Sequence, residues 1–144
     1  MSYARIWIHL VFATKERKPL LEKSIRGTVF NNILDNCRKK NIYLRNVNGY
    51  DDHVHCLLSL AKDQTISHVT QLIKGESSFW INKNKLTKEK FAWQDDYYAV
   101  SVSESNLLKV ANYINNQELH HASQSFSDEL NELIEKHNLK IISA

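Results

Sequence analysis

The residues best suited to catalysis are two histidines separated by one residue, and a tyrosine and a glutamine that lie four residues apart. His53 and His55 flank Val54 at the start of a largely apolar run, and Tyr113 precedes Gln117 much later in the chain. Successive side chains of an extended strand alternate between its two sides, so the two imidazoles project together and can hold one divalent ion. A short His-x-His motif also arises by chance in a chain with seven histidines, so the rest of the sequence must support it.

Tyr113 is the candidate nucleophile. A phenol has an ordinary pKa of about 10 and attacks poorly at neutral pH unless a cation or a base lies close to it. An ion on His53 and His55 supplies that charge, and Gln117 offers a carbonyl oxygen as a third ligand. Without a thiolate or carboxylate, such a site favours Mg²⁺ or Mn²⁺ over a structural zinc, and it leaves positions open for water and a phosphate oxygen. The expected chemistry is attack of the tyrosine on a phosphate, which displaces a 3′-hydroxyl and keeps the 5′-phosphate.

Hydrophobic periodicity and turn residues predict the order β-α-β-β-α-β followed by two more helices. This order is typical of a ferredoxin-like split βαβ sheet, an α+β fold in which the first and third strands are central. The histidine pair then lies on a rigid interior strand, with Val54 and Cys56 facing a core on the other side. The predicted elements are strand 5–14, helix 21–40, strand 42–48, strand 53–60, helix 66–82, strand 97–103, a helix from Ser103 or Ser105 to about residue 121, and helix 127–138.

The last two predicted helices carry apolar stripes, and the first of them carries the nucleophile. Tyr113 and Gln117 lie one turn apart at the border of its stripe, so a helix packed by its apolar side presents both together. The two stripes consist of Leu107, Val110, Ala111 and Ile114 on one helix and Leu130, Leu133, Ile134 and His137 on the other.

Composition limits the class of protein. The 144 residues, 42% of them hydrophobic, predict one domain spanning residues 1–144. A net charge of +3 permits a nucleic-acid partner without arguing for one. Cys37 and Cys56 lack the spacing of a zinc site or a disulfide framework, so buried thiols are expected. No window is apolar enough to span a membrane and no leader is visible, so we expect a cytoplasmic protein with no membrane partner.

Several blocks in chain order resemble the single-tyrosine HUH transposases of insertion sequences, the TnpA-like group, over nearly the whole chain. These blocks are His9 to Lys15 with Pro19 to Leu21, Asp52 to His55, Leu72 to Gly75 with Ser77 and Ser78, Trp93 and Gln94 with Tyr97, and Tyr113 and Ile114 with Gln117. The resemblance implies that His53, His55 and Gln117 hold the metal and that Tyr113 is the nucleophile. It further implies nicking and rejoining of single-stranded DNA through a 5′-phosphotyrosine, and recognition of hairpins at the ends of the element.

For several residues the sequence supports two interpretations. Lys74, Lys83, Lys85 and Trp93 belong to a stretch of lysines interleaved with aromatic residues, which suits single-stranded DNA but equally a solvated loop beside buried rings. Asp52 either orients a ligating imidazole or ends the preceding turn. His120 and His121 stand near a helix end, where solvated or capping histidines are common, and we assign them no role.

Two further expectations concern assembly and the competing function. The family it resembles works as a dimer whose sites combine the histidines of one subunit with the tyrosine helix of the other. A homodimer of this kind would also bury sheet edges and any uncovered part of the apolar stripes. The alternative function is a non-catalytic single-stranded nucleic-acid-binding module of RNA-recognition-like fold, which uses an open sheet face as a stacking platform.

Overall fold

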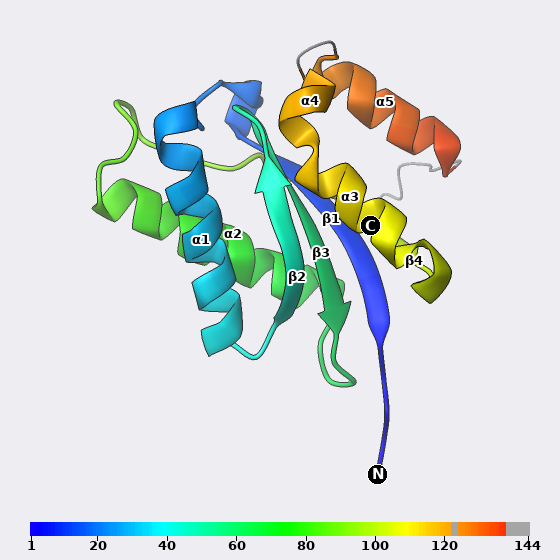
Figure 1. Ribbon diagram of the computed structural model, residues 1–144. Coiled ribbons are helices and arrows are strands. Elements are labelled where there is room, and N and C mark those ends of the chain that lie inside the picture. Colours follow the sequence, from blue (N-terminus) through cyan, green and yellow to red (C-terminus); the bar gives the residue numbers. More distant parts are fainter. Residues whose placement is uncertain (122–123, 138–144) are drawn as a thin grey trace.

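The computed structural model describes residues 1–121 and 124–137 and contains a four-stranded antiparallel sheet with the strand order β2-β3-β1-β4 (Figure 1). The first and third strands are therefore central, and the predicted ferredoxin-like α+β fold is confirmed. The main elements are β1 (Ile6–Ala13), α1 (Lys23–Lys39), β2 (Tyr43–Gly49), β3 (His53–Leu60), α2 (Ile66–Lys83), β4 (Tyr98–Val102), α3 (Leu107–Asn115), α4 (Gln117–His121) and α5 (Phe126–Lys136).

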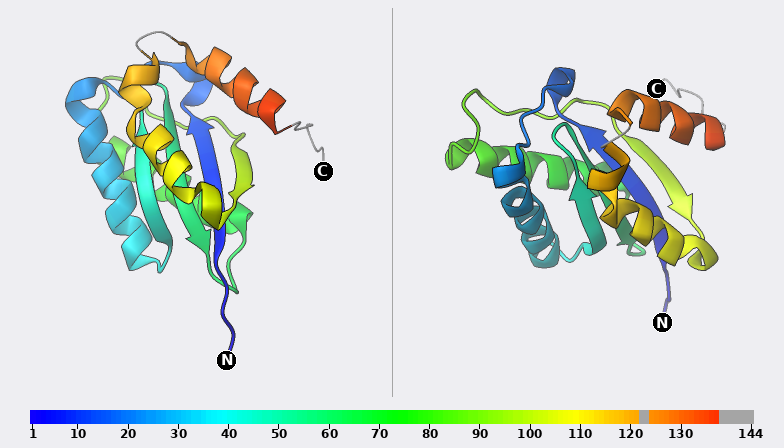
Figure 2. Two further views of the ribbon diagram at one scale, coloured as in Figure 1. Left: turned by 45° about the vertical axis from the view of Figure 1, so that its right-hand side comes forward. Right: turned by 45° about the horizontal axis from the view of Figure 1, so that its top comes forward.

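Helices cover both faces of the sheet, with α1 and α2 on one side and α3 to α5 on the other (Figures 1 and 2). Alternation along the central strands divides their side chains between the two layers. Leu10, Phe12 and Val54 join the large core under α1 and α2. Their neighbours on the opposite face, such as Val11 and Leu57, pack against the C-terminal helices. The two central strands are largely apolar because both faces are buried.

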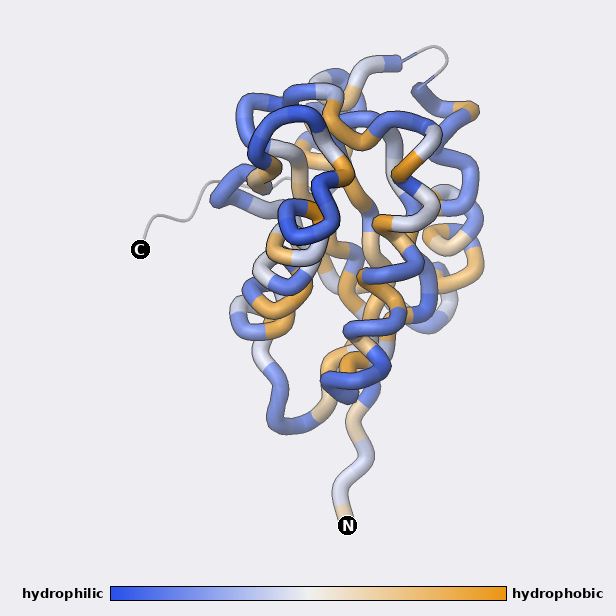
Figure 3. The backbone as a smooth tube through the Cα atoms, turned by 90° about the vertical axis from the view of Figure 1, so that its left-hand side faces the viewer, coloured by the Kyte–Doolittle hydropathy of each residue, from blue (hydrophilic) through white to orange (hydrophobic). Residues whose placement is uncertain are grey.

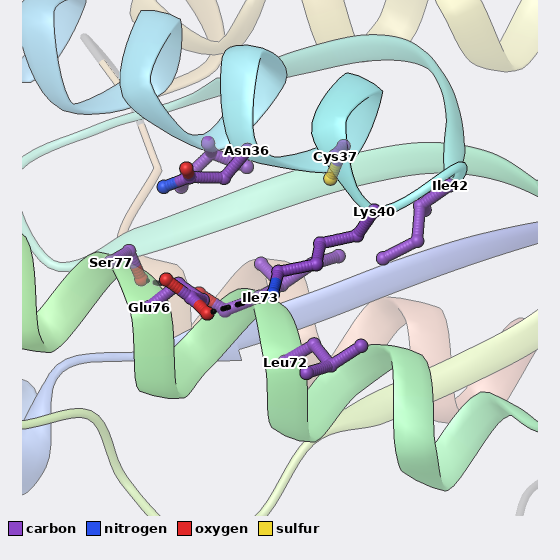
Figure 4. A pocket seen from close by; sticks show the side chains of 9 residues that line it. Asn36, Cys37, Lys40, Ile42, Leu72, Ile73, Glu76 and Ser77 are labelled. Carbon is purple, nitrogen blue, oxygen red and sulfur yellow. Dashed lines mark hydrogen bonds and ion pairs between the residues drawn. The ribbon is translucent and has the colours of Figure 1, made fainter.

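The α1–α2 layer follows from local sequence signals. Thr65 caps α2 by accepting a hydrogen bond from the backbone N–H of His68 at 3.1 Å, and Asn41, with φ of 58°, ends the chain reversal after α1. Apolar and hydrophilic residues alternate along these helices, as amphipathic packing requires (Figure 3). A small cavity between α1 and α2 contains the buried thiol of Cys37 and is crossed by an ion pair of Lys40 with Glu76 (Figure 4).

The predicted apolar stripes of the C-terminal helices are covered by the chain's own sheet. Ala111 and Ile114 of α3 pack on Trp7 and Leu57. Leu130 and Leu133 of α5, with Phe126, pack on the edge formed by β1 and β4, while Ile134 remains 37% exposed. A dimer is thus not needed to bury most of this apolar surface. The sheet face that a stacking platform would use is also occupied, which removes the structural basis of the RNA-recognition-like alternative.

The C-terminal helices differ in detail from the prediction. The helix expected to reach residue 121 is interrupted at Asn116, so that Tyr113 lies on α3 and Gln117 begins α4. Two asparagines in succession at 115 and 116 explain the break, because their side chains compete for backbone hydrogen bonds. The last helix begins at Phe126 and not at 127, since Ser125 caps it by accepting from the N–H of Asp128. The expected end at 138 lies outside the described residues.

The turn between β2 and β3 sets the start of the histidine strand. A Cβ at Gly49 would lie 2.1 Å from the carbonyl oxygen of His53, so a side chain cannot be accommodated there. The N–H of Tyr50 donates to the same carbonyl at 3.1 Å. Close backbone approach at this hairpin therefore fixes where His53 enters the sheet. Among the described residues, no helix combines the length and apolar character needed to cross a membrane.

Candidate active site

His53 and His55 lie at the centre of the molecule on β3. Both side chains are fully buried and project from the sheet face that α3 to α5 cover, with ring centroids 5.1 Å apart. Val54 and Cys56 face the large core on the other side, as predicted. A central strand paired on both edges holds the two imidazoles rigidly.

A second residue orients each of these imidazoles through its Nδ1 atom. Asp52 Oδ1 lies 2.8 Å from His53 Nδ1, and His9 Nε2 lies 2.8 Å from His55 Nδ1. Because a carboxylate only accepts hydrogen bonds, His53 carries its proton on Nδ1 and directs Nε2 into the site. Asp52 thus contacts a candidate ligand, and its carbonyl also accepts from the N–H of Thr14 in the turn, so both sequence interpretations apply.

Oxygen atoms from α4 and α5 complete the group. Gln117 Oε1 lies 3.0 Å from His53 Nε2, and Glu129 Oε1 lies 3.3 Å from His53 Nε2 and 3.1 Å from His55 Nε2. His53, His55 and Glu129 offer ligand atoms that all lie within 4.8 Å of one another. Buried imidazole nitrogens, a carboxylate oxygen and an amide oxygen are a suitable donor set for a divalent ion. The residues present therefore fit a metal centre.

Glu129 was not identified from the sequence. It is only 1% exposed, although a glutamate is rarely buried without a partner. A signal was available: Glu129 falls three residues after Phe126 and one before Leu130, on the apolar stripe of its helix. An acidic residue in such a stripe points into the protein, where it needs a cation or hydrogen-bond donors. His9 was likewise given no role in the site from the sequence, because it lies within an otherwise apolar predicted strand.

Tyr113 reaches the same group from α3. Its hydroxyl donates a short hydrogen bond to Glu129 Oε2, and its ring lies 5.7 Å from the ring of His55. The Nε2 group of Gln117 also donates to Glu129 Oε2, at 3.2 Å. The four residues proposed from the sequence as nucleophile and ligands, namely Tyr113, His53, His55 and Gln117, therefore meet within a single chain, and Glu129 touches all of them.

Burial and hydrogen bonding shift the pKa values in this cluster in opposite directions. Burial lowers the pKa of His53, but hydrogen bonds with Asp52, Glu129 and Gln117 outweigh it and raise the pKa to about 9. Burial dominates at His55 and lowers its pKa to about 4. The pKa of Glu129 is held well below its usual range, because hydrogen bonds from His53 and His55 overcome the effect of burial. Burial and the Glu129 carboxylate raise the pKa of the Tyr113 phenol, so the hydroxyl keeps its proton in this arrangement.

The site is closed, whereas the sequence predicted open positions. His53, His55 and Gln117 are fully buried, and the ring of Phe126 stacks on His53 with centroids 4.2 Å apart. The cover comes from α5, which places Phe126 and Glu129 directly over the histidines. A phosphate therefore reaches these atoms only if α5 shifts.

The proposed DNA-contact residues lie apart from this cluster, on the other side of the sheet. Trp93 is a core residue: it is 7% exposed, packs edge-on against Phe12 and donates from Nε1 to Ser77 Oγ at 2.9 Å. The enclosed ring matches the alternative of a buried aromatic beside a solvated loop, and a contact of Trp93 with DNA stays a prediction. Lys74 Nζ donates to the carbonyl oxygens of residues 94 and 95, so it braces a loop. Lys83 and Lys85 are exposed at the end of α2, as a phosphate contact or a solvated loop would both require.

A ferredoxin-like sheet with a histidine pair on its central strand and a tyrosine on a following helix defines the class of single-tyrosine HUH nucleases. Residues 2–117 match the family described as "Transposase IS200 like", and the chain belongs to that family. The transposases for insertion sequence element IS200 of Salmonella typhimurium (strain LT2) and of Salmonella typhi are each 29% identical to it over 115 residues, covering 76% of this chain and 74% of theirs.

Two solved structures share the fold. A candidate transposase from Deinococcus radiodurans R1 superposes with a TM-score of 0.65 at 23% identity, covering 81% of this chain and 93% of that one. A REP-associated tyrosine transposase bound to a REP hairpin gives a TM-score of 0.64 at 14% identity, covering 84% of this chain and 71% of that one. The matched family region ends at Gln117, so most of α4 and all of α5 lie beyond it.

Proposed function

We propose that this transposase nicks and rejoins single-stranded DNA through a 5′-phosphotyrosine on Tyr113, with a divalent ion, Mg²⁺ or Mn²⁺, held by His53, His55 and Gln117. The observation that carries the proposal is the meeting of the Tyr113 hydroxyl with the buried histidine pair through Glu129. When bound, the ion would polarise the scissile phosphate and balance the negative charge that develops on its oxygens. Residues 1–144 would supply this activity as one domain.

The residues of the chain account for the two transfer steps. In the first step the Tyr113 oxygen forms a bond to phosphorus, the bond from phosphorus to the 3′-oxygen breaks, and a free 3′-hydroxyl leaves. In the second step a 3′-hydroxyl attacks the phosphotyrosine, a new phosphodiester forms, and Tyr113 is released. Asp52 and His9 keep the imidazoles in fixed orientations during both steps, since each contacts a ring nitrogen on the side away from the site.

The expected DNA substrate carries a hairpin. The REP-associated relative of similar fold is bound to a REP hairpin, which supports the same kind of ligand for this chain. The exposed Lys83 and Lys85 are the cationic residues from the predicted set that remain available to phosphates, whereas Lys74 donates to backbone carbonyls of a loop. The cytoplasmic location expected from the sequence stays a prediction.

The test of the proposal is the covalent adduct. Tyr113→Phe removes the nucleophilic oxygen, so it should abolish divalent-metal-dependent attachment of protein to labelled single-stranded element ends while hairpin binding remains. Tyr97→Phe is the matched control, because Tyr97 is 40% exposed and lies outside the cluster. An undiminished adduct yield in the Tyr113→Phe protein would place the nucleophile elsewhere.

The homodimer with shared sites also stays a prediction. One chain already brings Tyr113, Gln117 and Glu129 to its own histidines, so a shared site requires α3 to α5 to pair with the partner's sheet. Mixing His53→Ala protein with Tyr113→Phe protein separates the arrangements. Cleavage should reappear in mixed dimers if sites form between subunits, because one site then has both groups intact. Continued inactivity after proven subunit exchange would show that each chain builds its own site.

A further inference from the structure

The histidine cluster brings two imidazole nitrogens and two side-chain oxygens together at a position where a cation can replace a proton. His121 Nδ1 lies 2.6 Å from the carbonyl oxygen of Gln124, so that nitrogen donates and Nε2 points into the cluster. His121 Nε2 faces two oxygens, Gln117 Oε1 at 3.2 Å and Glu129 Oε1 at 3.1 Å. His53 repeats the pattern, because Asp52 occupies its Nδ1 and the same two oxygens face its Nε2.

The orientation of the Gln117 amide is fixed independently. Its Nε2 group faces only acceptors, Glu129 Oε2 at 3.2 Å and the Tyr113 carbonyl at 3.4 Å, so its oxygen must face the histidines. Two imidazole Nε2 atoms, an amide oxygen and a carboxylate oxygen therefore converge. In the metal-free protein a proton on His53 Nε2 donates to these oxygens, and a bound ion would take the place of that proton. Buried acceptors that face one another are unfavourable unless a positive charge lies between them.

The distances from Glu129 Oε1 to the two imidazole nitrogens fit a metal centre. Neighbouring ligands on an ion with bond lengths of about 2.0–2.2 Å lie roughly 3.0–3.4 Å apart. Glu129 Oε1 lies 3.1 Å from His55 Nε2 and 3.3 Å from His53 Nε2, within that range. Its other oxygen accepts the hydroxyl of Tyr113. One carboxylate thus touches both the candidate metal position and the nucleophile.

Resting on the function proposed above, we propose that Glu129 is a ligand of the ion through Oε1 and positions the Tyr113 hydroxyl through Oε2, coupling metal binding to placement of the nucleophile. Glu129 comes from α5, beyond the matched family region, so the carboxylate is supplied by this chain's C-terminal helix. The two imidazoles favour Mn²⁺, Co²⁺ or Zn²⁺ over Mg²⁺, because Mg²⁺ prefers oxygen ligands and water, and the carboxylate is accepted by all four ions.

The first experiment measures metal binding without DNA. Co²⁺ is titrated into the full chain and followed by visible absorption, with a chelator as competitor. Glu129→Gln keeps the size and the hydrogen-bonding oxygen but removes the charge, so Co²⁺ affinity should fall by about tenfold or more. Glu132→Gln, an exposed position on the same helix, should bind like the wild type. Equal affinity in the Glu129→Gln and wild-type proteins, both folded by circular dichroism, would overturn the ligand assignment.

The second experiment measures the response of Tyr113 to metal in the unsubstituted chain and compares it with the Glu129→Gln protein. The ring signals of Tyr113 in the NMR spectrum, assigned with the Tyr113→Phe protein, should shift when Zn²⁺ binds, and this shift should vanish in Glu129→Gln protein with bound Zn²⁺. Unchanged Tyr113 ring signals on addition of Zn²⁺ to the wild-type protein would refute the coupling of metal binding to placement of the nucleophile. Both readouts are independent of cleavage, so loss of the proposed function would appear in the adduct assay while these results stand.

Discussion

Phe126→Ala should release α5 from the sheet while the rest of the domain stays folded. Phe126 is 5% exposed, stacks on His53 and contacts the cluster of Val11, Ala13 and Tyr98. Truncating a buried phenylalanine costs about 3–5 kcal/mol. Phe126 and Glu129 are the only buried residues of α5. The substitution therefore removes a large part of the packing that keeps α5 on the sheet.

A loss of about 3 kcal/mol corresponds to more than a hundredfold change in the equilibrium between docked and released α5. Hydrogen exchange of the metal-free protein is the assay, because it reports local opening helix by helix. Amides of α5 should lose protection by about two orders of magnitude, while those of β3 change less than tenfold. Leu108→Ala, at a position 66% exposed on α3, is the control and should leave both unchanged. Equal loss of protection in β3 and α5 would refute the reasoning, since it would make the helix part of one cooperative unit with the sheet.

Three further predictions follow from the same contacts. His53→Ala and His55→Ala should each abolish metal-dependent cleavage yet remain folded, and full activity in either at half-saturating metal would refute the ligand assignment. In metal-free protein, the pKa of His53 is raised to about 9 from an ordinary 6.5, so its stabilisation is complete below pH 6.5 and is lost as pH rises through about 9. The pKa of His55 is lowered to about 4, so stability also falls as pH drops from 6.5 toward 4. The melting temperature should therefore peak near pH 6.5, with the alkaline decline absent in His53→Gln and retained in the exposed control His68→Gln. Gly49→Ala should destabilise the domain by about 1–3 kcal/mol in denaturant unfolding, because its Cβ would meet the His53 carbonyl; an unchanged midpoint would mean that the hairpin relaxes freely.

The sequence determined the order of elements, the position of the histidine pair and the fold class. Strand β3 has the predicted bounds, 53–60, because alternation and turn residues act locally. The spacing of Tyr113 and Gln117 likewise placed both at one border of an apolar stripe, although Asn116 divides that helix in two. The order of elements and the fold class depend mostly on interactions between residues close in the chain, and such interactions can be predicted from one sequence.

Only the tertiary structure decided what surrounds these residues. Glu129 and His9 join the cluster from elements far away in the chain, and a single sequence contains no local signal for which helix packs over which strand. The enclosure of Trp93 and the closure of the site by α5 depend on the same packing. Burial depends on how the layers pack together. The pKa shifts and the access of a phosphate to Tyr113 follow from that burial, so one sequence does not reveal them.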